Sequence, residues 1–316
     1  MAAAAAAGLP MMAEAQGAYP NKPVRLVISQ AAGGSSDTIA RLWAEIAARQ
    51  LGGSVVVDNK PGAGGIIAAQ AVLSQPADGY TLFFAGVSQM VLNQFVYKPL
   101  PYSPLTDFAG VGMLTTVPFV LVASPKSGIK SFADLVARAK QQPGALNFSS
   151  AGLGNSTHLA VELLQKRAGI QMTHVPYKGE TDGLIALAGG DVQLMAPVLG
   201  TALPQIKAGK VVPLALLAPQ RMPDLPDVPT ARELGLQGFD SLGWSGIAAK
   251  AGTPPEIIAK LHATIAAFHR DPRVQERLKT MATIAMQGPA EQLMETARRD
   301  SATWAEAISE LNLSAK

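Results

Sequence analysis

Hydrophobic residues along the chain follow two alternating patterns. Short, mainly apolar runs, such as residues 24–29 and 55–57, are typical of buried strands. Each is followed by a stretch with helical spacing, as shown by Ile39, Trp43 and Ile46 within residues 38–51. The same alternation predicts further strands at 80–85, 119–123, 146–150, 172–175, 192–195 and 211–217, and further helices at 66–74, 131–140, 156–165, 183–187, 253–268 and 289–311, with another from 271. This order predicts α/β domains with mostly parallel sheets.

Residues 146–165 carry the clearest candidate for a binding site. A strand at 146–150 leads through the glycine turn 151–154 into a helix for which Asn155, Ser156 and Thr157 are candidate N-caps. Free N–H groups, the positive end of the helix dipole and two hydroxyls suit a carboxylate or a phosphate. The competing interpretation is a well-capped helix start that binds nothing.

A second strand, glycine turn and helix start spans residues 24–38. Gly33 and Gly34 precede the helix, and Asp37 lies in its first turn, where a carboxylate is more typical of capping than of catalysis. One such turn in each half of the chain predicts two loops that face each other across a cleft. The competing interpretation of Gly33-Gly34 is a tight turn without a ligand.

Composition excludes several classes of function. The 316 residues are 48% apolar and 16% charged. Basic residues exceed acidic residues by three, and the charged residues are scattered along the chain. A nucleic-acid surface needs clustered basic residues, so we expect none. The absence of cysteine excludes thiol catalysis, disulfides and cysteine metal sites.

Residues 1–18 are alanine-rich and contain Ala13-Glu14-Ala15, an acceptable A-x-A cleavage site. We interpret them as a residual signal peptide that lacks a positive n-region; a disordered alanine tail is the alternative. After them, no apolar run reaches the length of a membrane span.

Candidate catalytic groups form no complete set, and we expect no enzyme. Residues 243–246 resemble a nucleophile elbow, but its final glycine is replaced by Ile247. The histidines show no metal-binding spacing, so neither a metal nor a cofactor is predicted. His158 lies two residues from Ser156, which keeps open a hydrolase with Ser156 as nucleophile and His158 as base, although no third orienting group is found. The alternative is that His158 closes the pocket or hydrogen-bonds a neighbouring backbone group.

Seven short motifs follow one another along the chain: YPNKPVR at 19–25, GGSSD at 33–37, NKPGAGG at 59–65, DGYTL at 78–82, GLGNSTH at 152–158, VPYKG at 175–179 and AGTPP at 251–255. In this order they resemble the tripartite tricarboxylate transporter solute-binding proteins, the TctC or Bug family of bacterial extracytoplasmic receptors. The resemblance extends from Tyr19 to the C-terminus.

The resemblance implies a periplasmic-binding-protein-like fold of type II, in which two α/β domains close on a ligand and are joined by crossover strands. We place the crossovers near 120–123 and 242–247, so that domain 1 spans 19–121 plus 243–316 and domain 2 spans 122–242. It also implies a periplasmic receptor that passes a small carboxylate to a membrane permease. Separately, the exposed helical faces and scattered charges fit a monomer. A solute sensor without transport is equally compatible with the sequence.

In the family, the loop matching 154–158 holds a ligand carboxylate through backbone and hydroxyl groups. The loop matching 31–37 closes from the other domain, partly through bridging waters. The predicted ligand-binding residues are Ala32, Gly33, Gly34, Ser36, Asp37, Ser88, Gly154, Asn155, Ser156, Thr157, His158 and Pro197.

Two departures from the family bear on the ligand. Ser29 and Gln30 replace the usual proline and aromatic residue, and the apolar 196–198 replaces a frequent acidic or amide group. An ammonium-bearing amino acid would then have only Asp37 as a counterion. We therefore predict a carboxylate with an apolar or aromatic body, with a dicarboxylate as the close competitor. A tight complex with aspartate or glutamate would contradict this hypothesis.

Overall fold

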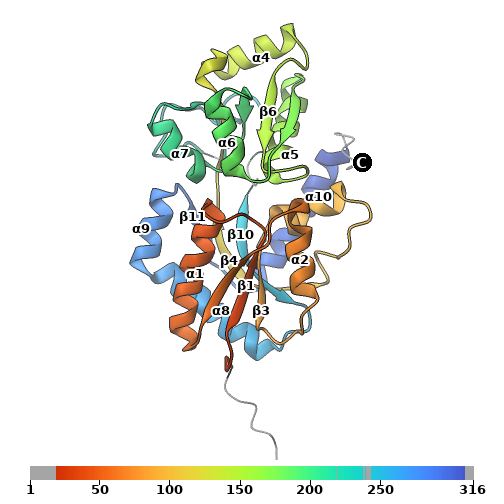
Figure 1. Ribbon diagram of the computed structural model, residues 1–316, viewed down its shortest axis with the longest axis vertical. Coiled ribbons are helices and arrows are strands. Elements are labelled where there is room, and N and C mark those ends of the chain that lie inside the picture. Colours follow the sequence, from red (N-terminus) through yellow and green to blue (C-terminus); the bar gives the residue numbers. More distant parts are fainter. Residues whose placement is uncertain (1–18, 219, 238, 240–242, 310–316) are drawn as a thin grey trace, which may run out of the picture.

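The computed structural model describes residues 19–218, 220–237, 239 and 243–309. Two sheets, each covered by helices, form two lobes that lie one above the other (Figure 1). We call the lobe with the six-stranded sheet lobe 1 and the lobe with the five-stranded sheet lobe 2. Among the described residues, no helix has the length and hydropathy needed to cross a membrane.

Lobe 1 has the strand order β11-β4-β10-β3-β1-β2. Its strands are β1 (Val24–Ile28), β2 (Val55–Asn59), β3 (Thr81–Gly86), β4 (Phe108–Thr116), β10 (Trp244–Lys250) and β11 (Ile284–Ala285). Its helices are α1 (Ser35–Leu51), α2 (Ile66–Leu73), α3 (Asn93–Val96), α8 (Pro255–Arg270), α9 (Pro272–Thr280) and α10 (Gln292–Ser309).

Lobe 2 has the strand order β7-β6-β8-β5-β9. Its strands are β5 (Phe119–Ala123), β6 (Asn147–Ser150), β7 (Thr173–Pro176), β8 (Leu194–Met195) and β9 (Val212–Leu217). Its helices are α4 (Phe132–Gln141), α5 (Ser156–Ala168), α6 (Glu180–Gly189) and α7 (Leu199–Lys207). Strand β5 belongs wholly to this second sheet, and the division of the chain into closing domains stays a prediction.

The expectation of mostly parallel sheets is wrong, because both sheets are mixed. Strand β1 pairs in parallel with β2 and β3, but β10 runs antiparallel to β3 and β4. In lobe 2, β6 pairs in parallel with β7 and β8, while β5 runs antiparallel to β8 and β9. Strand β5 is the first strand of lobe 2 after β4, and β10 is the first strand of lobe 1 after β9.

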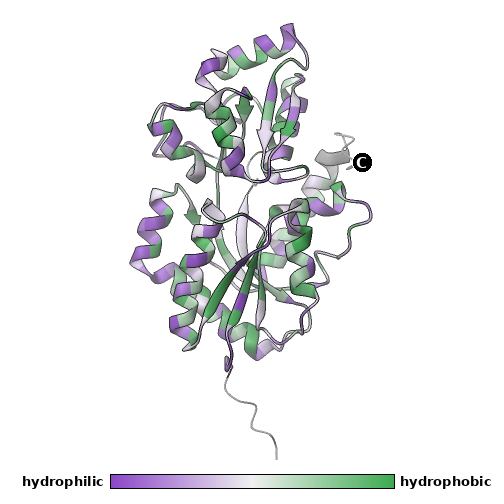
Figure 2. Ribbon diagram, viewed as in Figure 1, coloured by the Kyte–Doolittle hydropathy of each residue, from purple (hydrophilic) through white to green (hydrophobic). Residues whose placement is uncertain are grey.

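Apolar packing holds the lobes internally and to each other. In lobe 1, Trp43 of α1 and Phe268 of α8 are fully buried in one cluster, and the Trp43 indole donates to Thr264 Oγ1 at 3.1 Å. A second cluster is continuous from Phe83 in lobe 1 to Phe119 and Phe148 in lobe 2. Figure 2 shows the matching pattern most clearly in lobe 1, with largely hydrophobic strands inside and hydrophilic residues along outer helices such as α9.

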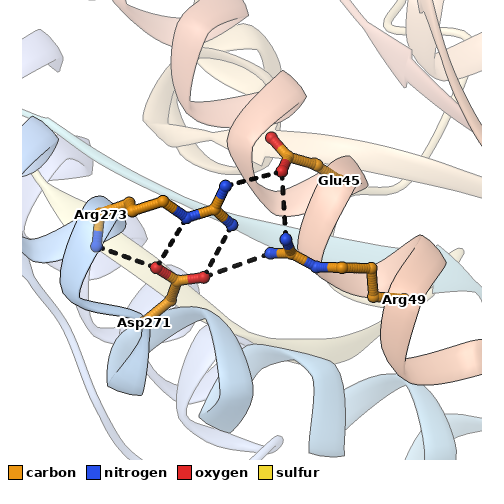
Figure 3. A network of polar contacts seen from close by, with 4 residues as sticks. All are labelled: Glu45, Arg49, Asp271 and Arg273. Atoms are coloured by element: carbon orange, nitrogen blue, oxygen red, sulfur yellow. Dashed lines mark hydrogen bonds and ion pairs between the residues drawn. The ribbon is translucent and has the colours of Figure 1, made fainter.

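Four charged residues tie α1 to the start of α9 (Figure 3). Arg273 bonds Glu45 and Asp271, each at 3.0 Å, and Arg49 contacts the same two carboxylates at 3.3 and 3.2 Å. Asp271 also accepts from the Arg273 N–H and so caps α9. This network orients α9, whose last turn carries Arg277.

Candidate functional site

The N-terminus of α5 is closed by its own side chains. Asn155 Oδ1 accepts from the Thr157 N–H at 3.0 Å and from the hydroxyls of Ser156 and Thr157 at 3.4 and 3.2 Å. Thr157 Oγ1 in turn accepts from the Ala151 N–H at 2.9 Å, and Thr157 is 2% exposed. The hydroxyls expected to meet a ligand therefore stabilise their own loop.

His158 also supports this loop from inside lobe 2. Its Nδ1 accepts from the Gly154 N–H at 3.2 Å, and its ring stacks on that of His174 with centroids 3.9 Å apart. The Nε2 of His174 lies 2.6 Å from Ser150 Oγ. Burial, together with the neighbouring His158, lowers the pKa of His174 to about 3, so His174 is neutral at neutral pH. The side chain of His158 thus positions the Gly154 backbone.

Ser156 and His158 are not arranged as a nucleophile and its base. Ser156 Oγ donates to Asn155, while His158 Nε2 lies 3.4 Å from Glu162 Oε1. Within the described residues, no hydrogen bond joins Ser156 to His158. A serine nucleophile requires such a contact for activation.

The N-terminus of α5 also contacts lobe 1. The Ser156 N–H donates to Ser88 Oγ at 3.1 Å, and the Tyr97 hydroxyl donates to the Leu153 carbonyl at 2.9 Å. Gly154 has φ +73°, and a Cβ there would lie 2.7 Å from Val96 Cγ1. The lobes are therefore in direct contact at this point.

The N-terminus of α1 is open by contrast. Gly34 is its N-cap and supplies no side-chain hydrogen bond. Among the described residues, the N–H groups of Ser35, Ser36 and Asp37 meet no acceptor. Ala32 and Gly33 of the preceding loop are exposed, and the Ser36 side chain is half-buried. This turn keeps the anion-binding donors that the α5 turn uses internally.

Asp37 stabilises the loop before α1. The residue is 4% exposed, and its carboxylate accepts from the Gly33 N–H at 3.0 Å, Arg41 Nε at 2.9 Å and Asn59 Nδ2 at 2.9 Å. Burial acts to raise the pKa of Asp37, but the hydrogen bonds from Arg41, Gly33 and Asn59 hold it below its ordinary value. The carboxylate is therefore ionised and already paired.

Two buried oxygens next to this loop have no partner. Ser29 Oγ and Gln30 Oε1, directly after β1, make no hydrogen bond to any residue that the structure describes. A buried unsatisfied polar group costs about 1–3 kcal/mol. A ligand or an ordered water that supplied a donor would remove this cost.

A cavity of about 440 Å³ lies between the lobes, where α1 and α9 face α6 and α7 (Figure 1). Small-molecule sites have about this size. The hydroxyls of Ser35 and Thr201 lie 3.0 Å apart and join the lobes at its wall. Of the predicted site residues, Gly33 and Gly34 line the cavity and the other ten do not. The lining residues are Gly33, Gly34, Ser35, Thr38, Arg277 and Met281 from lobe 1, and Thr181, Leu184, Ile185, Ala188, Gly200, Thr201, Pro204, Gln205 and Lys210 from lobe 2.

Glu180 supports the lobe 2 wall of this cavity. Its carboxylate accepts from the Val198 N–H at 2.5 Å and from the Thr201 hydroxyl. Burial raises the pKa of Glu180 to about 7, against the lowering effect of these hydrogen bonds. Because Thr201 donates to Glu180, Ser35 donates to Thr201. The neighbouring Pro197 is buried, and its carbonyl accepts from the Val120 N–H at 3.0 Å, which joins the end of β8 to β5.

Sequence reasoning missed the residues that complete the cavity. Glu180 and Thr181 directly follow the VPYKG motif, so inspection of the residues after that motif could have identified them. Thr201, Lys210 and Arg277 belong to no local pattern, and only the tertiary structure brings them together. No group of three or more potential metal ligands occurs within the described part of the chain.

The chain is similar to a family and to solved structures over most of its length. Residues 39–313 match the profile of the tripartite tricarboxylate transporter family receptors. Rpa4515 of R. palustris with adipate is 33% identical, with a TM-score of 0.89 over 94% of this chain and 100% of that one. The periplasmic binding protein BugD is 32% identical, with a TM-score of 0.88 over 94% and 100%. MatC of Rhodopseudomonas palustris with bound malate is 31% identical, with a TM-score of 0.87 over 92% and 100%.

Proposed function

The chain belongs to the tripartite tricarboxylate transporter receptors, a solute-binding protein family, and on this basis we propose that it captures a small organic carboxylate between its lobes. Membership confirms the resemblance inferred from the seven motifs, and the similar structures confirm a periplasmic-binding-protein fold of two α/β lobes.

The observation that carries the proposal is the interlobe cavity at the open N-terminus of α1. Gly34 and Ser35 supply backbone donors from lobe 1, and Thr181 supplies a hydroxyl from lobe 2. A ligand that contacts both lobes favours the closed arrangement, because those contacts are complete only when the lobes meet. Lobe closure is therefore the proposed mechanism of capture.

We place one ligand carboxylate at the N-terminus of α1. The predicted position at residues 154–158 is the alternative. There a ligand would have to displace Ser88 Oγ from the Ser156 N–H. Asn155 would also have to release the Thr157 N–H.

Dicarboxylates are the ligand class that we favour. Adipate and malate in the similar structures are both dicarboxylates. Asp37 is already paired with Arg41, so an amino acid would find no free counterion there for its ammonium group. An aliphatic or aromatic body remains compatible with the apolar side chains Leu184, Ile185 and Ala188 of the cavity.

The proposed setting is the periplasm, with delivery to the membrane permease of a tripartite tricarboxylate transporter by a monomeric receptor. A sensor that passes the signal to another protein is the alternative with the same binding chemistry. Binding without transport in a cell that contains the permease would favour the sensor.

A thermal-shift screen of mono-, di- and tricarboxylates, aromatic acids, amino acids and sugars tests the proposal. A ligand at about 100 times its Kd adds about 2.7 kcal/mol to the stability of the folded state. We expect carboxylates alone to raise the Tm, with no chemical turnover of the bound acid. Mass spectrometry of the denatured protein identifies any solute carried through purification. A bound or stabilising sugar, or a carboxylic ester converted to product, would contradict the proposal.

A further inference from the structure

Two cationic side chains line the interlobe cavity from opposite sides. Lys210 follows α7 in lobe 2, and Arg277 lies in the last turn of α9 in lobe 1. Within the described part of the chain, neither side chain has an ion-pair partner. Neighbouring cations do have one, since Lys207 bonds Asp224 at 2.8 Å and Arg273 bonds Asp271 at 3.0 Å.

None of the described residues that line the cavity is acidic. Two cations on opposite lobes give the cavity a positive potential, which attracts an anion. An anion bound by both side chains would contact one cation from each lobe. A guanidinium and an ammonium group are both strong hydrogen-bond donors to a carboxylate.

An apolar wall lies in the same cavity. It consists of Leu184, Ile185 and Ala188 on α6. Ile185 is 64% exposed, which leaves its side chain available to a ligand body. The open N-terminus of α1 borders the cavity as well, so anion-binding groups occur at more than one place around this wall.

We propose that Lys210 and Arg277 form a second anion site within the cavity and select solutes with two or more carboxylates. One carboxylate lies at the N-terminus of α1 and another between Lys210 and Arg277. The carbon skeleton rests on α6. This assignment rests on the proposed function and adds the part of the site that distinguishes a dicarboxylate from a monocarboxylate.

Isothermal titration with matched acids tests the assignment. The probes are adipate against hexanoate, and terephthalate against benzoate; each pair differs by one carboxylate. The variants are Arg277→Gln, Lys210→Gln and the double variant. Lys279→Gln is the matched control, because Lys279 is also an exposed cation of α9 but does not line the cavity.

We expect wild type to bind a dicarboxylate more tightly than its monocarboxylate partner. Each cavity variant should weaken dicarboxylate binding about 10- to 100-fold, as for loss of a hydrogen bond to a charged group. Lys279→Gln should leave the affinity unchanged. Monocarboxylate affinity should change little in any variant. Because all three side chains are exposed, the melting curves of the unliganded variants should match wild type.

Three results would overturn the assignment. The double variant could bind the dicarboxylate as wild type does, Lys279→Gln could lose as much affinity as Arg277→Gln, or the monocarboxylates could bind wild type as tightly as their partners. In each case the proposed function stands, because a carboxylate still binds. If no carboxylate binds wild type, the proposed function fails and the assignment fails with it.

Discussion

Helices α1 and α5 begin with the same local design and differ in what becomes of their first N–H groups. Both follow a strand and a glycine turn. At α5, Asn155 and Ser88 occupy donors of the first turn, and lobe 1 packs against Gly154. At α1, Gly34 supplies no side-chain cap, and the turn borders a cavity whose two cations have no ion-pair partner among the described residues. A glycine turn before a helix thus supplies anion-binding donors, but the surrounding side chains decide whether a ligand can use them.

Gly154→Val should have the largest effect on stability. The substituted residue would keep a positive φ of +73°, and its Cβ would clash with Val96 Cγ1. Backbone strain and overpacking together should cost about 4 kcal/mol. Denaturant unfolding measures the change. Gly33→Ala is the control from the other turn, since its φ is +89° but nothing lies within 4 Å, and about 1–2 kcal/mol is expected. Equal losses of stability at both positions would contradict the difference between the packed turn before α5 and the open turn before α1.

Glu180→Gln should remove a pH dependence of stability that arises at the wall of the cavity bordered by the α1 turn. The pKa of Glu180 rises from 4.5 to about 7 on folding, so the folded state holds its proton more tightly than the unfolded state. Its contribution to stability is complete below about pH 4.5 and is lost as pH rises through about 7, with a ceiling of about 3 kcal/mol. Relative to wild type, the variant should therefore gain stability between these pH values.

Unfolding of wild type and Glu180→Gln across this pH range measures the difference between them. Glu256→Gln, an exposed carboxylate in the first turn of α8, is the control and should keep the wild-type slope. A Glu180→Gln protein whose stability follows wild type at every pH would show that Glu180 does not bind its proton more tightly on folding.

Asn155→Ala should have a smaller effect. It removes the oxygen that caps α5 and accepts from Thr157, at a cost of about 1 kcal/mol. The expected result is a lower midpoint in denaturant unfolding with an unchanged m-value. Gly34→Ala, at a position that supplies no side-chain cap, should change stability less. If both variants lose the same stability, the proposed difference between the capped start of α5 and the uncapped start of α1 is wrong.

Most elements of the fold could be predicted because their signals are local. The apolar run of β5 predicted Phe119–Ala123 correctly, and Ser131 marked the start of α4. Helix α1 begins at Ser35, before the predicted residue 38, because a glycine N-cap leaves no side-chain signal. Strand β4 was missed, since Gly110 and Gly112 interrupt its apolar pattern and allow close packing against Leu293 and His262.

The cavity could not be predicted because its chemistry is not local. Helix α7 was missed, as Gly200 and Pro204 are poor helix residues, yet Thr201 within it meets Ser35 of the other lobe. Lys210 and Arg277 are ordinary surface cations in the sequence and become neighbours of one cavity only through the arrangement of the lobes. The glycine motifs identified the loops, but the lobe contacts determine which loop is open.

A matched pair of acidic N-caps tests most directly which helix start binds the solute. Gly34→Asp adds a cap to α1 at a position whose φ of −82° and ψ of 174° suit aspartate, and it places a negative charge at the proposed carboxylate position. Asn155→Asp keeps the cap of α5 and adds the same charge at the alternative position. Carboxylate affinity is measured for both by isothermal titration. We predict that Gly34→Asp abolishes binding while Asn155→Asp binds as wild type does. Loss of binding in Asn155→Asp with wild-type affinity in Gly34→Asp would contradict this prediction and return the ligand to α5.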